Sequence, residues 1–78
     1  MMNVYAIYDR LAETYGNPFI LDVKVAKRTF EWMKRDTELQ QRQDKEVRLL
    51  GTWNPEKGIE TVYTPEKVYE LDDKQEEQ

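Results

Sequence analysis

Apolar and polar positions follow a strand-like pattern at both ends of the folded part and a helix-like pattern between them. Residues 2–8, MNVYAIY, are rich in β-branched and aromatic side chains, which predicts a first strand. Met2, Val4, Ala6 and Tyr8 face one way, and Asn3, Tyr5 and Ile7 face the other. Both faces are largely apolar, as expected of a central strand covered on both sides. A shorter apolar run at residues 19–21 predicts a second strand.

Residues 22–35, DVKVAKRTFEWMKR, form the longest periodic stretch and predict the principal helix. Asp22 suits the N-cap, because its carboxylate can accept hydrogen bonds from the free amides of the first turn. Four apolar residues follow the three-four-three spacing of a stripe that faces a core: Val23, Ala26, Phe30 and Met33.

A second apolar stripe runs along the same helix through Val25, Thr29 and Trp32. A surface helix that packs on one sheet needs only one such stripe. Val25 and Trp32 are therefore predicted as a partner interface, or as core if the helix is covered on two sides.

The connections around this helix are less regular. Residues 9–17 predict either a helical turn containing Leu11, Ala12 and Tyr15, capped by Gly16, or a loop that ends in a Gly-Asn-Pro turn. Residues 36–46 are almost wholly polar and predict a mobile connector. Thr37 and Gln40 have capping-box spacing, so a short second helix can form there.

The second half of the chain predicts a hairpin. Residues 47–53 read as a strand with Val47, Leu49 and Trp53 on one face, and residues 59–63 as its partner. Residues 54–58 supply the turn, with Pro and Gly at its two ends. Residues 64–67 can open a short helix, or Val68, Tyr69 and Leu71 can instead lie along a sheet edge.

These elements predict one small α+β domain over residues 1–71, in the order β-β-α-β-β. Its sheet is mainly antiparallel, and residues 22–35 pack across one face. Residues 72–78 are expected to form a disordered acidic tail. A chain of 78 residues has room for one domain. It has no cysteine for a disulfide, so self-association is a plausible source of additional buried area.

The composition argues against catalysis. The chain has neither histidine nor cysteine, and so lacks the commonest general base and the commonest zinc ligands. Its neighbouring carboxylates, Asp9 with Glu13 and Glu56 with Glu60, fall on predicted loops and turns. We therefore expect no enzyme activity, no cofactor and no metal. No apolar run has the length of a membrane span, and the first ten residues do not resemble a signal peptide, so an intracellular protein without a membrane partner is expected.

Charge is unevenly distributed. The net charge is −4, and residues 66–78 alone hold six acidic and two basic residues, which leaves the rest neutral. The helix is locally basic, with a candidate nucleic-acid surface at Lys24, Lys27, Arg28, Lys34 and Arg35. Such a stripe can follow phosphates, and Trp32 or exposed tyrosines can stack on unpaired bases. The alternative is a solvated helix face with a Lys27–Glu31 pair.

Two other features have structural and functional interpretations. The acidic tail either keeps the protein soluble or competes with nucleic acid for the basic stripe. The aromatic residues outside the helix are expected to be core and cross-strand partners more than a base-stacking platform. They are Tyr5, Tyr8, Phe19 and Tyr63.

Several pieces of the chain, in order, resemble the small non-structural protein of gokushoviruses, tailless microviruses with single-stranded DNA genomes that infect bacteria. That family has a "YTIYD" strand followed by Ala-Glu, a helix with the pattern A-x-R-x-F, and an "L-x-x-x-G-x-F-D" strand before an acidic turn. The matching pieces are Ile7-Tyr8-Asp9, Ala12-Glu13, Ala26-Lys27-Arg28-Thr29-Phe30 and Leu49-Leu50-Gly51-Thr52-Trp53-Asn54. Trp53 and Asn54 stand where the family usually has Phe and Asp.

The resemblance implies a protein made in the infected cell, in the host cytoplasm, and absent from the virion. It also implies DNA binding, or a role in the switch from duplex replication to single-strand production. Two hypotheses follow. In the first, the protein binds single-stranded DNA weakly through the basic helix face during genome replication. In the second, it is an adaptor or homo-oligomer that binds itself or a replication protein through Val25 and Trp32, or through an open sheet edge.

Overall fold

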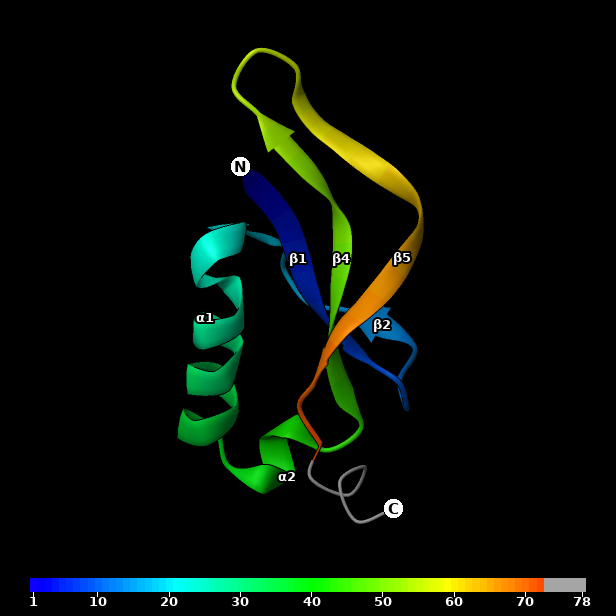
Figure 1. The fold of residues 1–78 in the computed structure, drawn as a ribbon. Helices are drawn as coiled ribbons and strands as arrows, with labels where there is room; N and C mark the ends of the chain where they lie inside the picture. The colour runs from blue at the N-terminus through cyan, green and yellow to red at the C-terminus, as the bar shows by residue number, and fades with distance from the viewer. Residues whose placement is uncertain (73–78) are drawn as a thin grey trace.

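A computed structural model of the chain describes residues 1–72, and for Tyr63 the backbone alone. Residues 73–78, most of the predicted acidic tail, lie outside the described residues. Figure 1 shows one sheet with a long helix along one face. The elements in chain order are β1 (Met2–Asp9), β2 (Thr14–Tyr15), β3 (Phe19–Asp22), α1 (Val23–Asp36), α2 (Leu39–Arg42), β4 (Lys45–Asn54) and β5 (Gly58–Glu70).

The sheet is antiparallel throughout, and β1 lies in its interior as predicted. β2 and β3 both pair with one edge of β1, β4 pairs with the other edge, and β5 pairs with β4. This arrangement confirms the α+β fold and the order of its main elements. The structure adds two short elements to that order, the two-residue strand β2 and the single-turn helix α2.

Helix α1 begins where the sequence predicts. The Asp22 carboxylate accepts a hydrogen bond from the backbone N–H of Lys24 at 2.8 Å, which satisfies one free amide of the first turn. Ala26 and Phe30 are buried, and Met33 packs partly against the same cluster. Val23 was predicted in this stripe but is 41% exposed, because it lies in the first turn, beyond the buried cluster.

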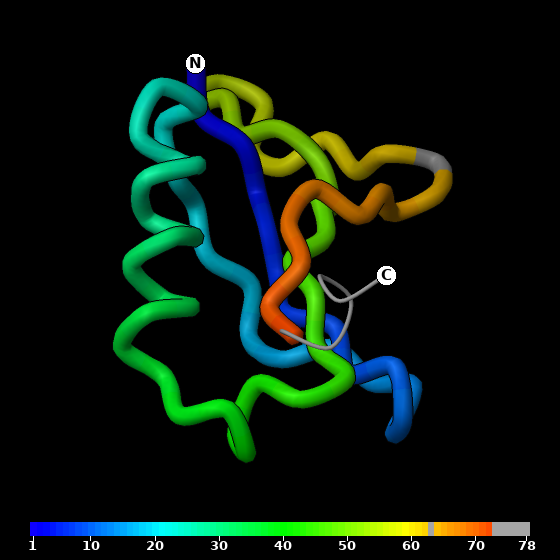
Figure 2. Tube along the Cα trace, turned by 60° about the horizontal axis from the view of Figure 1, so that its bottom comes forward, coloured from blue at the N-terminus to red at the C-terminus, as the bar shows by residue number. Residues whose placement is uncertain are grey.

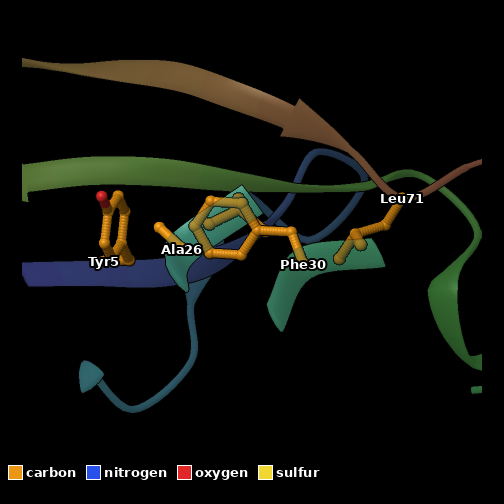
Figure 3. Packing of buried hydrophobic residues seen from close by; sticks show 5 residues of the cluster. Tyr5, Ala26, Phe30 and Leu71 are labelled. Carbon is orange, nitrogen blue, oxygen red and sulfur yellow. The ribbon is translucent and has the colours of Figure 1, made fainter. Parts of the chain in front are cut away.

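The core lies between α1 and the sheet. Its buried residues are Tyr5, Ala26, Phe30, Val47 and Leu71. Figure 3 shows Phe30 between Tyr5 and Leu71. The rings of Tyr5 and Phe30 meet edge to face, with their centroids 5.0 Å apart, a favourable aromatic geometry. Phe30 thus packs α1 directly against the central strand.

An irregularity in β4 changes which face its last residues occupy. Tyr5 pairs with Leu49, but the next residue back, Val4, pairs with Gly51, so Leu50 is an extra residue. Trp53 therefore pairs with Met2, on the face away from α1. The prediction that Trp53 shares a face with Val47 and Leu49 is wrong, because a bulge inverts the alternation beyond it.

Strand β5 is longer than predicted. Residues 64–67, where a short helix was one expectation, belong to β5. Val68 and Tyr69 also lie in β5, which confirms the sheet-edge alternative for them, whereas Leu71 follows the strand and is buried in the core. Glu66 pairs with Leu49 and Thr61 with Gly51, so the residues between Thr61 and Glu66 have no counterpart on β4. Figure 2 shows this segment looping away from the sheet.

Residues 10–13 form a turn between β1 and β2, so residues 9–17 adopt the loop alternative and not a helical turn capped by Gly16. The Asp9 carboxylate accepts hydrogen bonds from the backbone N–H groups of Leu11 and Ala12. These bonds lower the pKa of Asp9, that from Ala12 most. Glu13 completes the turn with a φ of 58°.

The connector after α1 contains α2, the short second helix that was one expectation for this segment. Arg42, the last residue of α2, donates hydrogen bonds to the carbonyls of Thr37 and Leu71. These bonds tie the connector to both α1 and the end of β5. Asp72, assigned by prediction to the tail, is only 1% exposed, and its carboxylate accepts from the backbone N–H of Asp44. The folded domain therefore includes Asp72.

Candidate nucleic-acid interface

The outward face of α1 carries exposed cations. The side chains of Lys24, Lys27, Arg28 and Arg35 form no hydrogen bond or ion pair with any residue of the described part. The Lys27–Glu31 pair of the alternative interpretation is therefore not formed. These four charges remain available to an anionic partner. We call them the basic face.

The helix dipole accounts for part of this charge. Lys34 and Arg35 lie in the last turn, where a positive charge stabilises the helix C-terminus. Lys34 is half-buried and lies at the border of the basic face. Lys24 lies in the first turn, which contains no acidic residue, and a positive charge there opposes the dipole. Stabilisation of the helix thus explains the positive charges of Lys34 and Arg35 at its C-terminus, but not the positive charge of Lys24 at its N-terminus.

The second apolar stripe is exposed. Trp32 is 55% exposed and Val25 is 37% exposed, so the alternative that both are core is wrong. The hydroxyl of Thr29, between them, donates to the carbonyl of Val25. Trp32 therefore presents a large aromatic surface to solvent on the same helix as the basic face.

A shallow hollow lies beside Trp32 on α1, with a volume of about 260 Å³. Arg28, Thr29, Trp32 and Arg35 line it. Arg28 lies one turn before Trp32 and Arg35 one turn after it, so both side chains start from the same side of the helix as the indole. We call this the arginine hollow.

A second hollow, of about 240 Å³, lies where α1, α2, β1 and β4 meet. We call it the corner pocket. Its lining residues are Ile7, Trp32, Met33, Asp36, Thr37, Gln41, Arg42, Lys45 and Leu71. The Lys45 ammonium donates to the carbonyl of Gln41 at 2.7 Å, which fixes a positive charge near the rim. Trp32 borders both this pocket and the arginine hollow.

The corner pocket continues toward the β1–β2 turn. A third hollow, of about 410 Å³, shares Ile7, Thr37, Gln41 and Lys45 with it. It reaches Asp9 and Gly16 at its far end. The corner pocket thus adjoins the third hollow through four shared residues and shares Trp32 with the arginine hollow. The sequence did not predict these hollows, since no local pattern places residues of separate elements around one space.

The opposite face of the sheet carries cations that are already paired. Arg10 donates to Glu46 at 2.7 Å and to both carboxylate oxygens of Glu70, and Arg48 also donates to Glu46. The guanidinium of Arg48 lies over the ring of Tyr8, with its carbon 3.7 Å from the ring centroid. Neutralised in this way, Arg10 and Arg48 are poor candidates for phosphate contacts.

These ion pairs set the pKa values of the two glutamates. Burial raises the pKa of Glu46, but the hydrogen bonds from Arg48 and Arg10 outweigh burial and hold the pKa below its ordinary value. The same balance holds for Glu70, where Arg10 and Lys67 donate. Both carboxylates are therefore charged in the folded protein at neutral pH.

Among the predicted core aromatics, Tyr5 is buried and Phe19 packs partly against the core. Tyr8 is a cross-strand partner of Tyr15 on the other face, as predicted, with ring centroids 4.7 Å apart. The side chain of Tyr63 is not among those described. Within residues 1–72 no group of three or more Asp or Glu side chains is placed to hold a metal ion, and no helix there has the length and apolar character to cross a membrane.

Comparison with protein-family models gives a match. A family model described as phage ORF5 protein matches residues 2–73, nearly the whole chain. No curated protein matches. No solved structure matches either.

Proposed function

Because the chain belongs to the phage ORF5 protein family, we propose that it is a non-structural accessory protein of a gokushovirus that acts in viral genome replication or single-strand production. It acts in the cytoplasm of the infected host cell. It binds single-stranded DNA weakly through the basic face of α1. The likeness of its strand and helix motifs to the gokushovirus pattern supports the narrower assignment.

One observation carries the DNA-binding proposal, the position of Trp32 between Arg28 and Arg35 around the arginine hollow. Single strands are held by cations that contact phosphates and by aromatic side chains that stack on bases. An exposed indole with one arginine a turn before it and another a turn after it supplies both on adjacent helical turns. Lys24 and Lys27 extend the positive charge along the same helix.

The overall charge sets the strength of this binding. The chain has a net charge of −4, so long-range attraction to DNA is weak. Contacts come from the local basic face and are few. The proposal therefore concerns binding that is detectable at low salt and falls steeply toward physiological salt.

Charge reversal tests the location of the site. Lys27→Glu and Arg28→Glu each place a negative charge on the basic face, and each should abolish binding of a fluorescent single-stranded oligonucleotide measured by anisotropy at low salt. Lys57→Glu makes the same change in net charge at the exposed β4–β5 turn, and should bind nearly as well as the wild type. Equal losses in all three variants would refute a site on α1.

A second candidate, self-association or binding of a replication protein, is favoured by the exposed Val25 and Trp32. An apolar interface of this kind should respond little to salt. Molar mass measured by light scattering, with and without the oligonucleotide, separates the two. The open-edge form of this candidate is less favoured, because Pro65 and the loop beside it interrupt the edge strand β5.

A further inference from the structure

The indole of Trp32 is shared by two hollows of different chemistry. On one side it meets the arginine hollow, which is lined by two arginines and a threonine. On the other side it meets the corner pocket, whose lining is largely apolar. A ligand with an anionic part and a flat apolar part fits this pair of sites, one part on each side of the ring.

The corner pocket has the chemistry of a site for a planar ring. Ile7, Met33 and Leu71 provide its apolar lining, and Leu71 is nearly fully buried. Asp36, Thr37 and Gln41 add polar groups to the lining, and these can donate to or accept from the edge of a ring. The volume of about 240 Å³ lies below the range of about 300–1,000 Å³ for drug-sized ligands. One ring system is therefore the expected occupant.

Charge around the pocket points to a ligand that carries phosphate. Lys45 donates to a backbone carbonyl, a neutral partner, and so retains its positive charge at the rim. Asp9 also lines the third hollow, and it is close enough to Lys45 for that ammonium to lower the pKa of Asp9. The Asp9 carboxylate therefore offsets part of the positive charge of Lys45 on that side. The strongest positive potential is therefore expected on the Trp32 side, where Arg28 and Arg35 lie.

We infer that the corner pocket is a nucleobase site. One unstacked base of a single strand enters it beside Trp32, while the adjoining phosphate lies in the arginine hollow. This inference rests on the proposed function and gives it a specific geometry. A base held within a duplex cannot enter the pocket, so the site predicts a preference for single strands.

Two strands of equal length and charge test the inference. An oligothymidine should bind the wild type about tenfold more tightly than an oligomer of abasic sites, the size of effect expected when base contacts are lost. Gln41→Trp fills the rim of the pocket and should bring oligothymidine affinity down to the abasic level. Gln40→Trp introduces the same side chain at an exposed neighbouring position that does not line the pocket, and should leave the difference unchanged.

A fluorescence measurement does not depend on the pocket-filling variant. Trp53→Phe leaves Trp32 as the only tryptophan. Oligothymidine should quench its emission, and the abasic strand should not. Circular dichroism confirms that each variant is folded.

The outcomes distinguish the nucleobase site from the DNA-binding proposal on which it rests. Equal salt-dependent binding of both strands, with no effect of Gln41→Trp and no selective quenching, would overturn the base site and leave the phosphate-binding proposal intact. Binding of neither strand at low salt would overturn both.

Discussion

Arg10 and Glu70, sixty positions apart in the sequence, form a two-pronged ion pair, with the two guanidinium nitrogens 3.0 and 2.9 Å from the two carboxylate oxygens. Arg10 follows β1 and Glu70 ends β5, while Glu46 on the intervening strand β4 accepts from the same guanidinium. One side chain therefore links the ends of three strands. Bidentate pairs of this kind are stronger than single charged hydrogen bonds.

Removal of Arg10 should destabilise the fold. Arg10→Met keeps much of the apolar stem but leaves Glu46, which is 4% exposed, without one of its two partners. Loss of one partner of a largely buried pair costs about 3 kcal/mol. Urea unfolding should show this decrease, whereas Lys24→Met on the exposed helix face should change stability by less than about 0.5 kcal/mol. Similar stabilities of the two variants would contradict a structural role for Arg10.

The ion pairs of Arg10 with Glu46 and Glu70 also predict that the stability of the fold is sensitive to acid. The pKa values of Glu46 and Glu70 are lowered in the folded state, so the unfolded chain binds protons first as the pH falls. Their contribution to stability is fully present above the ordinary value of 4.5 and is lost as the pH drops below it. The free energy of unfolding should therefore fall between about pH 5 and pH 3. Arg10→Met should flatten this dependence, and an unchanged slope would show that other carboxylates cause it.

Gly51 should not tolerate a side chain. A Cβ at this position would lie 2.8 Å from the Cα of Thr61 and closer still to the carbonyl oxygen of Glu60, both in the backbone of β5. Gly51→Ala should force β5 away and lower the thermal midpoint by about 10 °C or more, the effect of a loss of roughly 2 kcal/mol or more in a domain of this size. Gly16→Ala, where the nearest atom is 3.7 Å away, should be well tolerated. Comparable losses in the two variants would argue against the close approach of β4 and β5.

The two apolar stripes of α1 should respond differently to truncation. Phe30→Ala removes a buried ring that contacts Tyr5 and Tyr69, and should cost about 3–5 kcal/mol. Trp32→Ala removes an exposed ring and should cost much less, while it weakens binding of the single strand. If Trp32→Ala unfolded the protein, the indole would belong to the core and not to the interface.

Local periodicity was enough to predict most of the fold. Asp22 marks the start of α1, and the spacing of Ala26, Phe30 and Met33 identifies its buried side. The apolar character of both faces of residues 2–8 predicted that β1 lies inside the sheet. These features depend on residues close together in sequence, so the sequence pattern alone was enough to predict them.

The errors arose where distant segments decide the structure. The extra residue at Leu50 moves Trp53 to the other face, and the alternating pattern contains no sign of it. For residues 64–67 the sequence left a helix start and a sheet edge open; β5 runs through them, and Glu66 and Lys67 pair with β4. The basic residues of α1 were identifiable as a candidate site, whereas the corner pocket requires the packing of four elements.

The salt dependence of single-strand binding tests the central claim most directly. The four cations of the basic face are Lys24, Lys27, Arg28 and Arg35. If all four contact phosphates, the logarithm of the binding constant should fall against the logarithm of salt concentration with a slope of about −3. Replacing Arg28 and Arg35 together by alanine should halve that slope. A binding constant that does not change with salt, or a slope unchanged in the double variant, would contradict a phosphate-binding site on α1.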